Sequence, residues 1–161
     1  MYCPFLRARQ FELIALRELA NEEITQGVII PILEPVKETH NNLNLAHQVF
    51  RDKRQVAYLI VNPSVGDNNH YLEYLRSLEA EGDIFFKPAS HDRNNKQYIS
   101  ESIDKYNLND CMLICQNDLS ADDLNFRELV NSPEISTINV EDPGRNRSFH
   151  RRHSVIPAKL E

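Results

Sequence analysis

The stretch that decides the fold is GVIIPILEPVKE, residues 27–38, in which an apolar run ends abruptly on Glu34, Pro35 and Lys37. The run is near-continuous and rich in β-branched residues rather than alternating, which is typical of a parallel strand covered on both faces. Pro31 and Pro35 restrict the backbone around the end of this strand. Its polar end is either where a strand leaves the core or part of a site that several strands build together.

Similar apolar runs recur along the chain, mostly at intervals of about 25 to 28 residues, which is the length of a compact βα unit. Turn signals separate them, such as Gly27 and NPSVGD at 62–67. The expected strands are CPFL (3–6), VIIPIL (28–33), VAYLIV (56–61), IFF (84–86), CMLIC (111–115) and ISTINV (135–140), with SVIP (154–157) as a candidate seventh strand.

Amphipathic helical segments lie between these runs, identified by apolar residues three or four positions apart. In the first segment, FELIALRELANEE, Phe11, Ile14, Ala15 and Leu19 can share part of a face. The other segments are marked by Leu45, Ala46, Val49 and Phe50, by Tyr71, Leu75 and Leu78, by Ile99, Ile103 and Tyr106, and by Leu124, Phe126, Leu129 and Val130.

Alternating strands and helices predict an α/β protein with a parallel sheet. A closed barrel of eight units needs roughly 200 residues or more, whereas this chain has 161. We therefore expect a single α/β domain over residues 1–161, TIM-barrel-like but short of closure, with six or seven strands. An open doubly wound sheet is the alternative, although the chain has only 4 glycines and none follows the first strand as a phosphate-binding turn.

Composition narrows the class of protein. With 41% hydrophobic and 26% charged residues, the chain resembles a soluble globular protein, and no apolar run approaches the roughly 20 residues of a membrane span. The net charge of −6 argues against general coating of nucleic acid. The odd number of cysteines does not suggest a disulfide framework, so Cys111 and Cys115 are interpreted as buried free thiols in a reducing cytoplasm.

Polar side chains follow each apolar run. Because the C-terminal ends of parallel strands lie on one face, these side chains should converge although they are scattered in sequence. The candidate ligand-binding residues are Arg7, Arg9, Asn62, Lys87, Arg145 and Arg147, since arginine forks suit phosphate and carboxylate oxygens. The candidate catalytic residues are Glu34, Lys37, Asp118 and Glu141.

Two functions fit these residues. The first, which we favour because the carboxylates lack a spacing signature, is a binding component that recognises a small anionic molecule or a protein partner. The alternative is a metal-dependent phosphoester hydrolase, in which Glu34, Asp118 and Glu141 hold a magnesium ion while Arg7, Arg9 and Lys37 bind the phosphate. Magnesium is expected only under this alternative, and carboxylates more than about 8 Å apart would exclude a shared ion.

The opening MYCPFLRARQFELIALRELA, followed by IIPILEPVK and LIVNPSVGD, resembles an uncharacterised bacterial family related to the phage beta-protein group. Ala8 stands where that family usually has glycine. The resemblance implies a barrel-like α/β protein of bacterial or prophage origin, tied to phage–host conflict. The matching positions are Tyr2, Pro4, Leu6, Arg7, Arg9, Glu12, Leu13, Ala15 and Leu16, then Pro31, Glu34, Pro35, Val36 and Lys37, then Asn62 and Pro63, with the pair Arg151 and Arg152 also similar.

Members of that family are longer chains, so we expect this sequence to be an N-terminal portion, and the closing AKLE is interpreted as a vector-derived scar. A portion of a barrel would leave a sheet edge open. Such an edge invites self-association or pairing with a protein partner.

Overall fold

The computed structural model describes residues 2–22, 27–36, 39–64, 68–82, 84–92, 96–115 and 124–140. The chain divides into two compact units, Met1–Ala89 and Ser90–Glu161. Each unit is a succession of parallel strands and helices, and the strand order runs β1-β2-β3-β4-β5-β6, in the order of the sequence.

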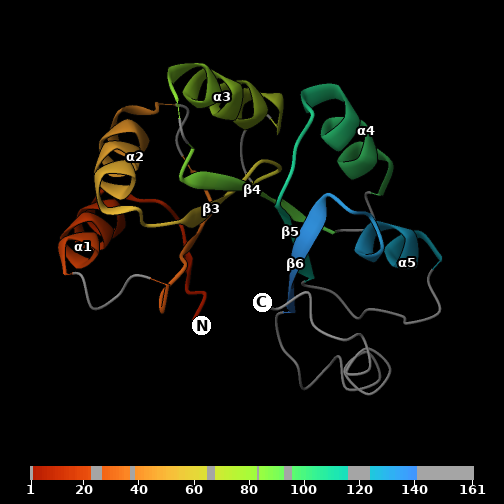
Figure 1. Ribbon diagram of the computed structural model, residues 1–161, viewed down its shortest axis with the longest axis horizontal. Helices are drawn as coiled ribbons and strands as arrows, with labels where there is room; N and C mark the ends of the chain where they lie inside the picture. Colours follow the sequence, from red (N-terminus) through yellow and green to blue (C-terminus); the bar gives the residue numbers. More distant parts are fainter. Residues whose placement is uncertain are drawn as a thin grey trace. The chain divides into compact units, whose positions relative to one another are not determined.

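The first unit holds three complete strands and most of a fourth. Neighbouring strands are parallel, with Phe5 opposite Ile32, Ile32 opposite Tyr58, and Tyr58 opposite Lys87. Its helices lie along one side of these strands (Figure 1). The elements are β1 (Phe5–Leu6), α1 (Gln10–Asn21), β2 (Ile32–Leu33), α2 (Asn41–Lys53), β3 (Ala57–Ile60), α3 (Asn68–Glu81) and the beginning of β4 (Phe86–His91).

The two inner strands of this unit, β2 and β3, are buried on both faces, whereas β1 is half-buried. Every residue of β2 and β3 is buried, as expected for a parallel sheet whose apolar runs are continuous rather than alternating. Between β1 and β2 the ladder continues to Glu34, whose backbone N–H donates to the carbonyl of Leu6 at 2.7 Å. Glu34 therefore lies at the end of the paired region, and its position is fixed by the sheet.

The second unit contains the end of β4 and the elements that follow it. The backbone N–H of Asp92 donates to the carbonyl of Ile114 at 2.9 Å, and β5 pairs with β6 in parallel, with a register shift between Cys111 and Met112. The elements are α4 (Lys96–Tyr106), β5 (Cys111–Cys115), α5 (Leu124–Val130) and β6 (Ile135–Val140).

The sequential strand order confirms the expected fold class, an α/β protein that is TIM-barrel-like but unclosed. A doubly wound sheet reverses its strand order at a switch point, and no reversal occurs among β1 to β6, so the alternative does not apply. The order begins at β1 and ends at β6 without joining them. The candidate seventh strand, SVIP, is not among the described residues.

Four strands differ from their predicted bounds: β1, β2 and β3 are shorter than the predicted runs 3–6, 28–33 and 56–61, and β4 lies mostly beyond its predicted range. The expected strand IFF ended at Phe86, whereas β4 begins there and continues to His91. The sequence KPASH lies beyond the predicted end of the strand, but Ala89, Ser90 and His91 are buried, so tertiary packing overrides the local pattern. Lys87 is consequently the second residue of β4 and does not lie at the C-terminal end of a strand.

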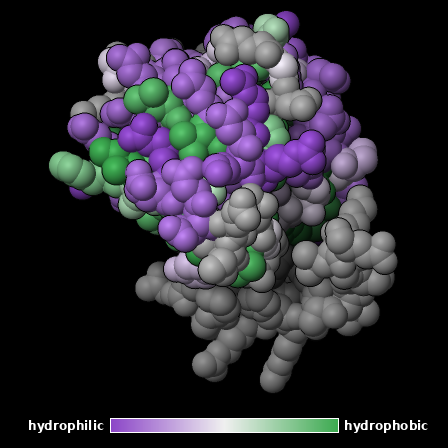
Figure 2. Space-filling view, turned by 60° about the vertical axis from the view of Figure 1, so that its left-hand side comes forward, coloured by the Kyte–Doolittle hydropathy of each residue, from purple (hydrophilic) through white to green (hydrophobic). Residues whose placement is uncertain are grey.

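The buried face of α1 also differs from the predicted one. Leu13, Leu16 and Ala20 are buried, whereas Phe11 is 81% exposed. The predicted residues and the buried residues both have helical spacing, and packing in the folded chain determines that Leu13, Leu16 and Ala20 are the buried ones. Figure 2 turns the α1 and α2 side of the first unit forward and shows apolar side chains among hydrophilic ones; Phe11 and Leu45 are the large exposed apolar residues of these two helices.

Candidate functional site

The ends of three successive strands meet at the carboxylate of Glu34. Its side chain is 3% exposed, and its Oε1 accepts hydrogen bonds from the backbone N–H of Ser64 at 3.0 Å and from Ser64 Oγ at 2.6 Å. Its Oε2 lies 3.6 Å from Nε of Arg7. Arg7 follows β1, Glu34 follows β2 and Ser64 follows β3, so we call these three residues the strand-end group.

Local sequence explains how the group forms. Pro35 is buried directly after Glu34, and Asn62 and Pro63 are buried directly after β3. These buried residues hold both strand ends close to the sheet before the chain reaches the surface. Ser64 is exposed as a residue, yet its two donors point back to the buried carboxylate.

The Arg7 side chain remains open to solution. It is 53% exposed, although its Nε lies beside the buried Glu34. A guanidinium carries five N–H donors in a planar fork, so one contact with a carboxylate does not use up its capacity. The buried acid therefore orients the arginine while leaving it able to bind an anion from solution.

The loop between β1 and α1 has an unusual backbone. Ala8 adopts a φ of 49°, in the left-handed region that favours glycine. The next residue, Arg9, is exposed, and its backbone N–H donates to Oε2 of Glu12 at 2.8 Å. Arg9 thus stands at the start of α1, two residues from Arg7, as a second exposed cation on the same loop.

A hollow lies beside the strand-end group. Its empty volume, counted out to open solvent, is about 290 Å³. Leu13, Leu43 and Pro35 are buried in its floor, whereas Gln10 and Thr39 are exposed at its rim. The complete lining is Ala8, Gln10, Leu13, Pro35, Val36, Thr39, Asn42 and Leu43.

A group of aromatic and imidazole rings joins the beginnings of α2 and α3. The ring centroid of His40 lies 4.5 Å from that of His70 and 4.1 Å from that of Tyr74, and Tyr74 donates from its hydroxyl to Asn44 Oδ1 at 2.8 Å. Burial, and secondly the neighbouring His70, lower the pKa of His40 below its usual 6.5. A neutral His40 therefore stacks at the start of α2, where the positive end of the helix dipole also disfavours a cation.

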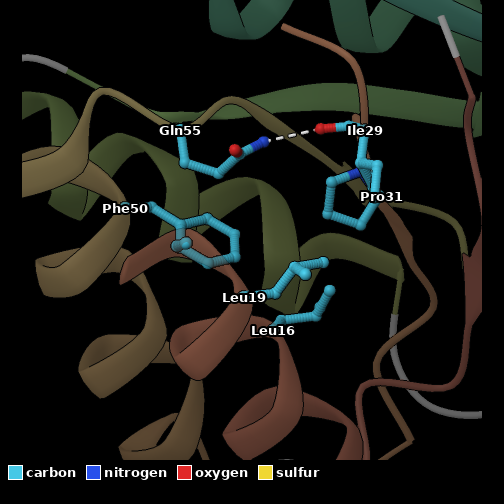
Figure 3. Close-up of a pocket in the computed structure, with 7 residues that line it drawn as sticks. Leu16, Leu19, Ile29, Pro31, Phe50 and Gln55 are labelled. Carbon is cyan, nitrogen blue, oxygen red and sulfur yellow. Dashed lines mark hydrogen bonds between the residues drawn. The ribbon is translucent and has the colours of Figure 1, made fainter. Parts of the chain in front are cut away.

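Near the starts of β2 and β3, an apolar pocket of about 190 Å³ of empty volume lies among residues of α1, α2 and the segment before β2 (Figure 3). Gln55 is its polar member, and its side-chain amide donates to the carbonyl of Ile29 at 2.7 Å and to that of Val56 at 2.9 Å. Leu16, Leu19 and Phe50 supply apolar walls. This pocket is a packing defect that the side-chain amide of Gln55 closes, and none of its lining residues is charged.

The cysteines support no nucleophilic role. Cys3, Cys111 and Cys115 are all free thiols. Burial, followed by the nearby charges of Asp110 and Glu134, raises the pKa of Cys111 to about 12. Burial, and secondly Asp92, also raises the pKa of Cys115. Both thiols of β5 therefore stay protonated at neutral pH, which agrees with the interpretation as buried free thiols.

Of the residues predicted from sequence, the structure brings Arg7 and Glu34 together, places Asn62 at the neighbouring strand end, and places Lys87 elsewhere. The sequence did not single out Ser64, although its position after Asn62 and Pro63 at a strand end was a signal. Lys37, Asp118, Glu141, Arg145 and Arg147 lie outside the described residues, as do Arg151 and Arg152. Within the described ranges, no group of three or more His, Cys, Asp or Glu could hold a metal ion.

No family model, curated protein or solved structure matches this chain. None of the helices in the described part of the chain is both long enough and apolar enough to cross a membrane.

Proposed function

We propose that the first unit binds a small anion at the strand-end group. The observation that carries this proposal is the pairing of a buried, hydrogen-bonded Glu34 with a half-exposed Arg7. Holding a guanidinium in place lowers the side-chain entropy that it would lose on binding. A pre-oriented guanidinium suits the paired oxygens of a carboxylate or phosphate.

The same geometry weighs against a role for Glu34 in holding magnesium. Oε1 accepts two hydrogen bonds from Ser64, and Oε2 lies beside the cation of Arg7. A metal ligand would have to give up these contacts to place an oxygen at 2.0–2.6 Å from the ion. The other two proposed ligands, Asp118 and Glu141, fall in ranges that the structure does not describe. No observation favours the hydrolase over anion binding.

The wider setting is a second part of the proposal. We place the protein in the bacterial or prophage family that its opening phrases resemble, in the cytoplasm, with a role in phage–host conflict. The left-handed φ of Ala8 supports this relationship, because the family has glycine there and glycine adopts that conformation without strain. The three free thiols are consistent with a reducing compartment. Plaque counts on host cells that express the wild type or Arg7→Gln would test the role, which requires protection only by the wild type.

Titration of the protein with inorganic phosphate and with acetate, followed by calorimetry or amide NMR shifts at low ionic strength, tests the binding activity. We expect Arg7→Gln to weaken binding by at least roughly tenfold, since a hydrogen bond to a charged group contributes about 1.5–3 kcal/mol. Arg51→Gln, on the exposed side of α2, is the matched control and should bind as the wild type does. Equal affinity of Arg7→Gln and the wild type would refute the proposal.

A further inference from the structure

We infer that the ligand of this face is a small organic anion, with its carboxylate or phosphate head at Arg7 and a short hydroxyl-bearing chain in the hollow next to it. This inference rests on the proposed function, because it specifies what the strand-end group binds. It depends on three observations: where the hollow lies, how large it is, and which side chains line it.

The hollow and the strand-end group are connected through adjacent residues. Ala8 lines the hollow and directly follows Arg7, and Pro35 lines it and directly follows Glu34. Consecutive Cα atoms lie about 3.8 Å apart, so the hollow begins one residue along the chain from Arg7 and from Glu34. A head group at Arg7 therefore has the hollow within reach of the first few atoms of its chain.

The size of the hollow limits the ligand. Its empty volume, which includes open solvent, is about 290 Å³, at the lower limit of the roughly 300–1,000 Å³ that small-molecule sites usually have. A chain of a few heavy atoms matches this space.

The lining of the hollow defines the chemistry of that chain. Leu13, Leu43 and Pro35 offer an apolar floor that favours methylene groups. Gln10, Thr39 and Asn42 bring amide and hydroxyl groups to the same space, and these can hydrogen-bond a hydroxyl on the ligand. A bare inorganic ion would leave both kinds of group unused, whereas a hydroxylated short-chain phosphate or carboxylate uses both.

Calorimetric titration with five compounds tests the inference: inorganic phosphate, methyl phosphate, glycerol phosphate, acetate and glycolate. We expect each buried methylene to strengthen binding by roughly fourfold, so methyl phosphate should bind more tightly than phosphate, and glycerol phosphate more tightly again. The acetate and glycolate titrations show whether a carboxylate head serves as well as a phosphate head.

Two variants alter the hollow without touching the strand-end group. Val36→Phe fills the hollow and should remove the preference for glycerol phosphate while inorganic phosphate still binds. Leu45→Phe adds a ring at an exposed position of α2 and is the matched control, expected to keep the preference. Thr39→Val removes one hydroxyl at an exposed position with little change in shape, and it should weaken glycerol phosphate by roughly fivefold and methyl phosphate much less.

The outcomes separate the two proposals. If phosphate binding needs Arg7 but the organic compounds bind no more tightly, or if both hollow variants keep the wild-type preference, the inference is wrong and the proposed function stands. If none of the five compounds binds to the folded wild type, the proposed function and the inference both fail. If thermal melting shows Val36→Phe to be unfolded, Thr39→Val decides.

Discussion

Truncation of Glu34 is the sharpest test of the strand-end group. Glu34→Ala removes an acceptor of two hydrogen bonds from Ser64 and the partner of Arg7. Hydrogen bonds to a charged group contribute about 1.5–3 kcal/mol each, and the lower value applies because Ser64 is exposed and its donors can bind water after truncation. The Arg7 ion pair adds less than about 1 kcal/mol, since its guanidinium is largely in solvent. We expect a loss of about 3–4 kcal/mol in the free energy of unfolding.

Glu34→Gln separates charge from shape. The amide oxygen can still accept from Ser64, but the bonds become neutral and the ion pair with Arg7 is lost, so we expect a smaller loss of about 1–2 kcal/mol. This variant should also weaken phosphate binding, because Arg7 is no longer oriented. Glu18→Ala, at an exposed position of α1, is the control and should stay within about 0.5 kcal/mol of the wild type.

Urea unfolding followed by tyrosine fluorescence provides the measurement. The chain has no tryptophan. Tyr58, Tyr71 and Tyr74 are buried in the first unit and Tyr106 in the second, so the fluorescence reports on both units, with most of the buried tyrosines in the unit that contains Glu34. Far-UV circular dichroism gives a second probe of the same transition. A loss below about 1 kcal/mol for Glu34→Ala, or equal losses for Glu34→Ala and Glu18→Ala, would contradict the role of Glu34 as a buried anchor.

Three other perturbations test other parts of the first unit. Gln55→Ala should lower the free energy of unfolding by about 2–3 kcal/mol in urea titrations, because two carbonyls lose their amide donor. The control Gln97→Ala removes an exposed amide and should lower it by less than about 0.5 kcal/mol. Similar losses for the two variants would contradict the reasoning. The lowered pKa of His40 means that the unfolded chain binds more protons than the folded chain below pH 6.5, so stability should fall as the pH drops from 6.5 towards the folded pKa. A plot of wild-type stability against pH should therefore be steeper in this range than that of His40→Phe. Parallel curves would refute this assignment. Ala8→Gly should raise the thermal unfolding midpoint slightly. The relief of about 1–2 kcal/mol of strain in the left-handed conformation exceeds the roughly 0.4–1 kcal/mol lost through the greater entropy of the unfolded chain. A lower midpoint would show that the Ala8 backbone is not strained.

Much of the fold follows from local sequence patterns. The runs at 111–115 and 135–140 are strands with the predicted bounds, and all five predicted helices occur. These elements could be predicted because strand and helix periodicity are local properties that a short window of sequence carries. The face that carries the candidate site could also be predicted, because parallel strands connected through helices bring their C-terminal ends to one side.

Other features required the tertiary structure. The buried face of α1 was wrong in the prediction, because Phe11 and Leu13 belong to different stripes that both have helical spacing and only packing in the folded chain selects one. The extent of β4 was wrong in the prediction, because KPASH has little strand propensity and is ordered by its neighbours. The stack of His40 on His70 joins residues 30 positions apart in sequence, and no local pattern announces such a contact.

The stretch at 27–38 likewise has some features that its sequence predicts and others that only the tertiary structure sets. Sequence alone determined that GVIIPILEPVKE contains a buried parallel strand and that Glu34 stands where the strand ends. Only the tertiary structure decided what Glu34 contacts. Parallel register places Ile32 opposite Tyr58, and this alignment carries Ser64 to the carboxylate across 30 residues of chain. Strand register, which is fixed by the burial of side chains in the sheet, decides which residues meet across such a sequence separation. The residues around Glu34 do not encode this register by themselves.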